Sequence, residues 1–581
     1  MFFQKEMKDD IIDAILDTPL YGLIGVSRDR LVYVSTEEGY NGIWSSDLNG
    51  ENRIRLYDKP FFIHAFPRWE SKYVVYVVDV TRGYEHHLIY YSDIKEGGYS
   101  LALDINPVRI TGVAFYDNKI VYTASTRKKI SIVMGRFNER PTKVIDTNLY
   151  VRVIDFNGRY IILEGNEKYE PDKRKVFMYD TKGDEFLSIP EDEGTSTSMP
   201  RLYKDRLLYL AYSNGDIEIR VCELDKMRCK TLETPKNLDL PMKSIDILNL
   251  GWGNNSEIWI SIKNEGRCIL TVDGNVVPTP EGYISNATIY NKVVYYNHSS
   301  IMNPTSLWKY LPDKKMNIKI LGADTPEILR KNIKEIRFVK YKSKDGLEIP
   351  SFLVLNKKAE KEALIYIHGG PWREMADRWS VTVSILAAAG YHIMIPNYRG
   401  SIGYGEEFRR LLIGDPGGMD LEDIVYAYKY LIEEEISKDV GLVGFSYGGF
   451  LALLAAGRYA RLWKYVVAGS GICDWESIYK NSDYSFKRFI EILFKGDLEL
   501  MKERSPKKYI ENIEAPLCIV QPENDTRTPL NPVLECVKKL KRLNKVFELH
   551  IIRDTGHILD TNEKFMRKFI PVLNFLKKYS K

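Results

Sequence analysis

Short apolar runs that follow polar turn residues fill the chain from about residue 24 to residue 325, where helical periodicity is nearly absent. Seven of these runs resemble one another, and each leads from a turn into a strand with a large residue near its centre. The central residues are Tyr33, Tyr76, Tyr122, Ile162, Tyr209, Trp259 and Tyr295. They recur at intervals of 36 to 50 residues, which is typical of propeller blades. The pattern predicts an all-β seven-bladed β-propeller over residues 24–325. A loose pair of β-sandwiches, the alternative, would not produce seven regular units.

The pattern changes near residue 326, after which apolar strands alternate with segments of helical spacing up to residue 581. This alternation predicts a second domain over residues 326–581, built on a mostly parallel sheet with helices on both faces. In residues 1–23, Ile11, Ile12, Ile15 and Leu16 share one helical face. That N-terminal helix is too short to form a domain, and we expect it to pack against the C-terminal domain.

The segment Gly444-Phe445-Ser446-Tyr447-Gly448 lies between a predicted strand and a predicted helix. G-x-S-x-G is frequent by chance, but at a strand-to-helix turn it is the nucleophile elbow of the α/β-hydrolase fold. Glycines on both sides of the serine let the strand and the helix approach closely. We therefore predict that Ser446 is a catalytic nucleophile at the N-terminus of a helix.

A serine nucleophile needs a base and an acid, which follow it in the order acid then histidine in this fold. Only His550 and His557 follow Ser446. His550 lies inside an apolar strand, whereas His557 follows that strand in a glycine-containing loop at the sheet edge, where active sites lie. We predict that His557 is the general base and that Asp525, in the polar loop after the preceding strand, is the acid. The alternatives for the acid are Glu523, Asp554 and Asp560.

An oxyanion hole needs two backbone N–H groups aimed at the developing negative oxygen. Tyr447 supplies the first, because it directly follows the nucleophile. The second is expected from the turn His368-Gly369-Gly370-Pro371, and we favour Gly370 over Gly369. His368 is expected to brace this turn rather than transfer protons.

Composition narrows the function classes. The chain has 83 basic and 79 acidic residues, so its net charge of +4 gives no case for nucleic-acid binding. The best apolar stretch, Ile385 to Ile395, is shorter than the roughly 20 residues that span a membrane, and the N-terminus is charged. We therefore expect a cytoplasmic protein without a membrane partner. Without metal-ligand spacing or a nucleotide-binding glycine motif, we expect no metal and no cofactor. The 39 tyrosines favour strands.

Six cysteines are too few for a disulfide scaffold. Cys222 and Cys229 would lie directly opposite each other across a hairpin with a two-residue turn at Asp225-Lys226. We predict two reduced thiols at this pair, with a disulfide as the alternative.

Five runs match a known family: HGGPW (368–372), NYRGSIGYGEEF (397–408), GFSYGGF (444–450), NDTRTPL (524–530) and DTGH (554–557). The chain resembles the prolyl oligopeptidase family of serine peptidases and, within it, the archaeal acylaminoacyl peptidases. The resemblance covers the whole chain and implies an N-terminal helix, a seven-bladed propeller and an α/β-hydrolase domain. It also implies that Ser446, Asp525 and His557 form the catalytic triad.

The resemblance implies further substrate-binding residues. Arg527 is expected near the substrate carbonyl one residue beyond the scissile bond, and Trp475, Phe486 and Phe489 around an apolar pocket for the residue before that bond. Each of these three could equally belong to a helix core. The HGGPW run lacks the oxyanion-hole tyrosine of prolyl-specific and dipeptidyl relatives, which favours the acylaminoacyl branch. Glu37-Glu38 follows Ser35-Thr36 rather than aromatic residues, so we interpret this pair as a solvated hairpin.

These observations predict a serine exopeptidase that releases an N-acylated amino acid from short peptides, with the propeller as a size filter. A dipeptidyl peptidase or an oligopeptide endopeptidase of the same family is the alternative, followed by a broad carboxylesterase. A propeller scaffold with an inactive hydrolase domain is the non-enzyme alternative. The resemblance also makes a homodimer or higher homo-oligomer plausible.

Overall fold

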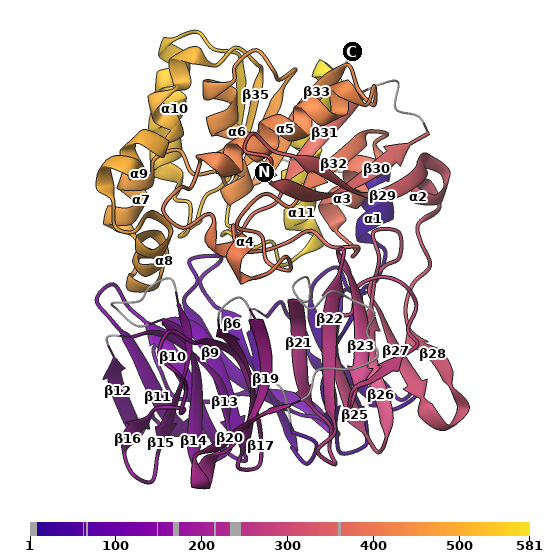
Figure 1. Cartoon of the computed structure of the whole chain (residues 1–581), viewed down its shortest axis with the longest axis vertical. Helices are drawn as coiled ribbons and strands as arrows, with labels where there is room; N and C mark the ends of the chain where they lie inside the picture. The colour runs from indigo at the N-terminus through magenta and orange to yellow at the C-terminus, as the bar shows by residue number, and fades with distance from the viewer. Residues whose placement is uncertain are drawn as a thin grey trace, which may run out of the picture.

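Four-stranded antiparallel sheets, seven in the described part of the chain, form the N-terminal domain of the computed structural model (Figure 1). The structure describes residues 9–61, 63–65, 68–147, 149–166, 173–213, 216–232, 246–357 and 362–580. The prediction of a seven-bladed propeller joined to an α/β-hydrolase domain is confirmed.

Each blade is a meander of four consecutive strands. The strands are β1–β4 (Tyr21–Ser27, Arg30–Ser35, Gly42–Asp47, Ile54–Tyr57), β5–β8 (Ile63–Ala65, Tyr73–Asp79, His87–Asp93, Gly97–Leu101), β9–β12 (Arg109–Tyr116, Lys119–Ser125, Ile130–Arg136, Lys143–Thr147), β13–β16 (Tyr150–Phe156, Tyr160–Asn166, Arg174–Asp180, Glu185–Leu187), β17–β20 (Ser196–Tyr203, Arg206–Ser213, Asp216–Glu223, Arg228–Leu232), β21–β24 (Asp246–Trp252, Ile258–Asn264, Arg267–Val272, Asn275–Val277) and β25–β28 (Ala287–Tyr290, Val293–His298, Ser306–Leu311, Met316–Leu321).

The seven large residues that mark the repeat all lie on the second strand of a blade. Each is at most 4% exposed, because this strand lies inside its sheet and packs against the neighbouring blades. Tyr33 and Tyr295, for example, belong to one apolar cluster that joins the first blade to the last. Burial of these side chains between sheets explains why a large residue recurs once per blade.

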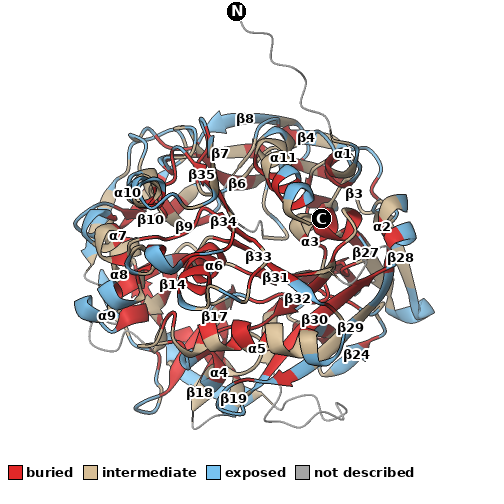
Figure 2. Cartoon of the chain, turned by 90° about the horizontal axis from the view of Figure 1, so that it is seen from above, coloured by how far each residue is buried: buried red, intermediate tan, exposed pale blue. Residues whose placement is uncertain are grey.

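The hydrolase domain is built on one eight-stranded sheet in the order β29-β30-β32-β31-β33-β34-β35-β36. Its strands are β29 (Ile333–Lys342), β30 (Glu348–Asn356), β31 (Glu362–Ile367), β32 (His392–Pro396), β33 (Asp439–Phe445), β34 (Val466–Gly469), β35 (Leu517–Pro522) and β36 (Phe547–Ile552). The pairs from β32 to β36 are parallel, and the first two strands are antiparallel. Buried residues follow the centre of this sheet (Figure 2).

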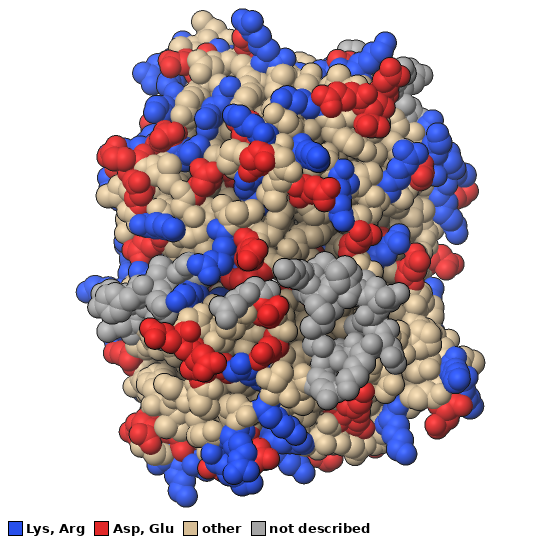
Figure 3. All heavy atoms as spheres, viewed as in Figure 1, with Lys and Arg blue, Asp and Glu red and all other residues tan. Residues whose placement is uncertain are grey.

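Helices cover the sheet. They are α2 (Glu327–Asn332), α3 (Val381–Ala388), α4 (Glu406–Arg410), α5 (Met419–Glu433), α6 (Tyr447–Arg458), α7 (Trp475–Asn481), α8 (Tyr484–Phe494), α9 (Leu498–Arg504), α10 (Leu530–Arg542) and α11 (Asn562–Tyr579). Positive and negative side chains are intermixed over the face of the molecule seen in Figure 3. In the described residues, no helix combines the length and the apolar character that crossing a membrane requires.

The N-terminal helix α1 (Asp10–Leu16) packs on the hydrolase domain against α3 and α11. Asp9 caps it by accepting hydrogen bonds from the N–H groups of Ile11 and Ile12. Ile12, Ile15 and Leu16 are buried in the core of the hydrolase domain. Residues 1–8 of the predicted helical segment lie outside the described residues.

The preference for reduced thiols at Cys222 and Cys229 is wrong, because the structure joins the two residues in a disulfide. They are directly opposite in the β19–β20 ladder, across a turn that runs through Leu224–Lys226. Direct opposition brings the two sulfurs within bonding reach. A second disulfide, which the sequence did not indicate, joins Cys473 before α7 to Cys536 in α10.

Candidate active site

Ser446 lies in the sharp turn that joins β33 directly to α6, with φ 60° and ψ −122°. This strained backbone exposes the serine at the helix N-terminus, and the glycines around it make the turn possible. A Cβ atom on Gly448 would lie 2.0 Å from the Ile367 carbonyl oxygen, and one on Gly444 would lie 2.1 Å from that of Gly448. Only glycine therefore fits at these two positions.

Three side chains from the ends of three strands form a continuous hydrogen-bonded chain. His557 Nε2 lies 3.0 Å from Ser446 Oγ, and His557 Nδ1 lies 2.7 Å from Asp525 Oδ2. The spacing lets the imidazole accept the serine proton while the carboxylate holds the ring in the required tautomer. The structure thus brings together the nucleophile, base and acid that the chain order indicates.

Asp525 is fully enclosed and held by three further donors. Its Oδ1 accepts the N–H groups of Arg527 and Thr528, and its Oδ2 accepts the Thr528 hydroxyl. Burial opposes ionisation, but the His557 ring and the Thr528 hydrogen bonds outweigh it and hold the pKa of Asp525 below its usual value. The carboxylate is therefore charged at neutral pH.

The alternative candidates for the acid and the base do not join this hydrogen-bonded network. Asp554 is exposed and pairs with Arg82, while Glu523 accepts the N–H of Asp554. Asp560 pairs with Lys564, and His550 remains within β36 next to Glu548.

The expected oxyanion donors lie beside the serine. Tyr447 begins α6, and no acceptor within the described chain binds its N–H group or that of Gly370. Gly370 has a φ of 138°, which favours glycine, and the neighbouring Gly369 packs directly on the Ser446 side chain. His368 braces the turn: it stacks on Tyr398 and its Nε2 lies 3.0 Å from Ser401 Oγ.

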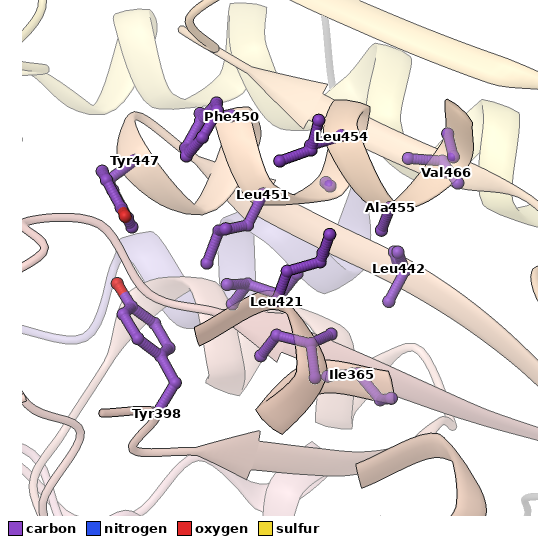
Figure 4. Close-up of a cluster of buried hydrophobic side chains, with 14 of the residues drawn as sticks. Ile365, Tyr398, Leu421, Leu442, Tyr447, Phe450, Leu451, Leu454, Ala455 and Val466 are labelled. Atoms are coloured by element: carbon purple, nitrogen blue, oxygen red, sulfur yellow. The ribbon is translucent and has the colours of Figure 1, made fainter. Parts of the chain in front are cut away.

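Asp420 from α5 holds the side chain of Tyr447. The Tyr447 hydroxyl donates to Asp420 Oδ2 at 2.6 Å. The rings of Tyr398 and Tyr447 stack with their centroids 6.1 Å apart (Figure 4). Asp420 is fully buried, and burial raises its pKa to about 7.

Asp420→Asn is expected to remove a pH dependence of stability. A raised carboxyl pKa stabilises the fold below the unfolded value of about 3.9, and that stability is lost as pH rises to about 7. The difference in melting temperature, variant minus wild type, should therefore increase by about 2 °C or more between pH 5 and pH 7. The difference should level off above about pH 8, where Asp420 is ionised in the folded and the unfolded state. Thermal denaturation at each pH measures it, and a constant difference from pH 5 to pH 8 would contradict the role of Asp420.

A propeller loop, residues 80–86 between β6 and β7, presses on both loops that carry the acid and the base. The Asn524 amide donates to the Arg82 carbonyl oxygen at 3.0 Å. Gly83 and Gly556 meet backbone to backbone, and Glu85 pairs with Arg527 at 2.7 Å. The two segments are more than 400 positions apart, so no local sequence pattern indicates this contact.

Gly556→Ala is expected to lower kcat by about tenfold to hundredfold, because its Cβ would lie 2.2 Å from the Gly83 carbonyl oxygen and must displace the His557 loop. Steady-state kinetics on a chromogenic substrate measure the effect. Gly22→Ala is the control, since its nearest neighbour would lie 4.0 Å away. Unchanged kcat in Gly556→Ala would show that the propeller contact does not position His557.

The predicted specificity residues are only partly brought together. A cavity of about 490 Å³ between the domains is lined by Trp372, Phe489, Ile492 and Arg527. Phe486 stacks behind Phe489 and does not line the cavity. Trp475 is fully buried against Phe450 and Phe494 and belongs to the core.

Trp372 is the wall residue that the sequence reasoning missed. It packs edge-on against Phe489 at 5.5 Å between ring centroids. The available signal was its position two residues after Gly370, in the run HGGPW.

Two family models match the chain. The model described as "Acylamino-acid-releasing enzyme-like, N-terminal domain" matches residues 32–308, and the one described as "Prolyl oligopeptidase family" matches residues 378–581. Residues 378–581 are therefore a prolyl oligopeptidase family domain. Ser446, Asp525 and His557 all lie within the second match.

Curated relatives are similar to this chain over part of their length. "Uncharacterized peptidase YuxL" of Bacillus subtilis is 30% identical over 275 residues, which are 44% of this chain and 41% of that protein. The human "Acylamino-acid-releasing enzyme" is 26% identical over 231 residues, which are 38% of this chain and 32% of the enzyme. The matched segment thus spans less than half of each relative.

Solved structures of two other peptidases show the same fold. An acylaminoacyl peptidase of Pyrococcus horikoshii superposes with a TM-score of 0.73 at 18% identity, covering 98% of this chain and 97% of that one. A puromycin-hydrolyzing peptidase of Mycobacterium tuberculosis gives 0.81 at 14% identity, covering 99% and 96%.

Proposed function

We propose that this protein is a serine exopeptidase that releases an N-acylated amino acid from the N-terminus of short peptides. The Ser446–His557–Asp525 geometry supports acyl transfer, and the prolyl oligopeptidase family domain supports a peptidase. One observation favours a blocked N-terminus over a free one. Of the described residues that line the cavity beside the site, the two carboxylates, Glu85 and Glu164, are already paired with arginines. Among these described residues a free ammonium group would find no unpaired carboxylate, whereas an acyl group carries no charge.

The reaction follows from the geometry. Ser446 Oγ attacks the carbonyl carbon while His557 Nε2 accepts the serine proton, and the N–H groups of Tyr447 and Gly370 stabilise the oxyanion. The C–N bond then breaks, and His557 returns the proton to the leaving amine. Water attacks the acyl-enzyme with His557 again as base, and Ser446 is regenerated.

The walls of the cavity support the substrate class. Trp372, Phe489 and Ile492 offer an aromatic and aliphatic surface for the side chain before the cleaved bond. The position of the cavity between the hydrolase domain and the propeller favours short peptides over folded proteins.

The test compares acetyl-Phe-p-nitroanilide, Phe-p-nitroanilide and Gly-Pro-p-nitroanilide. We expect kcat/KM for the acetylated substrate to exceed that for each of the two unblocked substrates by about tenfold or more. The ammonium group of an unblocked substrate would lose hydration in the cavity without gaining a counter-ion. A preference for Phe-p-nitroanilide or Gly-Pro-p-nitroanilide would replace the proposal with an aminopeptidase or dipeptidyl peptidase.

A further inference from the structure

Arginines are the most numerous charged residues among the described residues that line the cavity between the domains and the channel in the propeller. The cavity between the domains continues into a channel of about 500 Å³ through the propeller, because Arg152, Glu164 and Arg174 line both. Of the described residues that line the two spaces together, seven are arginines, three are carboxylates and none is lysine. The whole chain, by contrast, balances 83 basic against 79 acidic residues. The interior is therefore selectively positive.

Three of these arginines lie together on neighbouring blades. Arg152 lies on β13, Arg174 on β15 and Arg201 on β17. Among the carboxylates that line these spaces, Glu164 pairs with one of the three arginines, Arg152, at 2.7 Å. Burial raises the pKa of Glu164, but the charges of Arg152 and Arg174 outweigh burial and lower the pKa to about 2. Arg174 is also 3.5 Å from Glu406, a residue of α4 that pairs more closely with Arg409.

Within the described residues Arg201 forms no ion pair, although the nearby carboxylates Asp155 and Glu164 oppose the effect of burial on its pKa. Its guanidinium donates to the Pro200 carbonyl oxygen at 2.9 Å and to Asn249 Oδ1 at 3.1 Å, and no carboxylate in the described residues lies within 4 Å. Burial lowers the pKa of Arg201, because the charged guanidinium has lost part of its hydration. An anion bound in the channel would offset this desolvation free energy. Arginine is also suited to a carboxylate, which it can bind through two parallel N–H groups.

The chemistry of the proposed reaction supplies such an anion. The acyl group and the residue before the cleaved bond occupy the apolar part of the cavity, so the rest of the peptide must extend into the remaining space. That space leads to Arg152, Arg174 and Arg201. A short leaving peptide carries a carboxylate at its end.

We propose that Arg152, Arg174 and Arg201 bind the C-terminal carboxylate of the leaving peptide. This inference rests on the proposed function and adds that the preferred substrates are N-acylated peptides with a free C-terminus. The arginines then contribute a second end-recognition site, which excludes long chains because both ends of a substrate must lie in one enclosed space.

The test uses acetyl-Phe peptides with two, three or four alanines after the phenylalanine, each as the free acid and as the C-terminal amide. In the wild type, kcat/KM for the acid should exceed that for the amide by about tenfold at one length or more, as expected for hydrogen bonds to a charged group. In Arg201→Gln this acid-to-amide ratio should fall to about a third of the wild-type ratio or less. Arg201→Lys, which keeps the charge, should retain more of the ratio than Arg201→Gln.

Two controls separate the possible failures. Arg140→Gln removes an exposed propeller arginine that pairs with Asp104, and it should leave the ratio unchanged. Hydrolysis of acetyl-Phe-p-nitroanilide, whose leaving group has no carboxylate, should be the same in Arg201→Gln as in the wild type. Equal rates for acid and amide at every length would overturn the arginine site and leave the proposed function intact. Failure of the proposed function would appear instead as a preference for unblocked p-nitroanilides.

A third substrate separates the two sources of a carboxylate. Acetyl-Phe-Ala-Glu-amide carries its charge on a side chain, and we expect it to react no faster than acetyl-Phe-Ala-Gln-amide. An acceleration equal to that of the free acids would overturn the assignment to the C-terminus.

Discussion

Ser446→Ala is expected to lower kcat on acetyl-Phe-p-nitroanilide by about 10⁶-fold, the scale on which serine peptidases lose activity without the nucleophile. The oxygen that forms the acyl-enzyme lies 3.0 Å from His557 Nε2, and alanine leaves nothing for that base to activate. The oxyanion donors and the cavity remain, so a residual rate about 10³-fold or more above the uncatalysed reaction should persist. Substrate binding should change little, because the variant removes one oxygen atom.

The measurement combines single-turnover kinetics with labelling by a fluorophosphonate probe, which reacts only with an activated serine. Ser188→Ala, an exposed serine between blades four and five, is the matched control and should keep full activity and labelling. Full activity in Ser446→Ala would remove Ser446 from the mechanism. Labelling that persists in this variant would place the reactive serine elsewhere.

Features that repeat locally or follow chain order could be predicted from the sequence. The propeller was predictable because each blade buries one large side chain on its second strand, as Tyr76 and Tyr209 do. The hydrolase elbow was predictable because Gly444 and Gly448 have no room for a Cβ atom, so the motif is a steric requirement. Chain order then left few candidates for the base and the acid.

Features that depend on contacts between distant segments could not be predicted. Glu85 reaches Arg527 only because the two domains pack together, and Cys473 meets Cys536 only because α10 lies beside the loop before α7. Trp475 has the composition of a pocket residue, but three-dimensional packing places it in the core. The positive channel belongs to the same class, since it needs Arg152 and Arg201 from neighbouring blades to face one axis.

Asp525→Asn is expected to lower kcat by about 10⁴-fold, even though the substitution changes almost no volume. The reason lies in the donors around the carboxylate. Oδ1 accepts the N–H groups of Arg527 and Thr528, so the asparagine carbonyl oxygen must take that position. The amide NH₂ group then takes the place of Oδ2, 2.7 Å from His557 Nδ1, and donates to it. His557 is thereby held with its proton on Nε2, and it cannot accept the proton of Ser446.

The matched control is Asp554→Asn, which removes an acid of the loop that carries His557. Asp554 is exposed and its pair with Arg82 is 3.3 Å long, so this variant should change kcat by less than about threefold. The kinetics of both variants are compared on acetyl-Phe-p-nitroanilide. Asp525→Asn changes the tautomer of His557 and not the fold, so the variant should keep the melting temperature of the wild type. Its affinity for a slowly hydrolysed substrate should also be that of the wild type. A large loss in Asp554→Asn with activity retained in Asp525→Asn would transfer the role of the acid to Asp554.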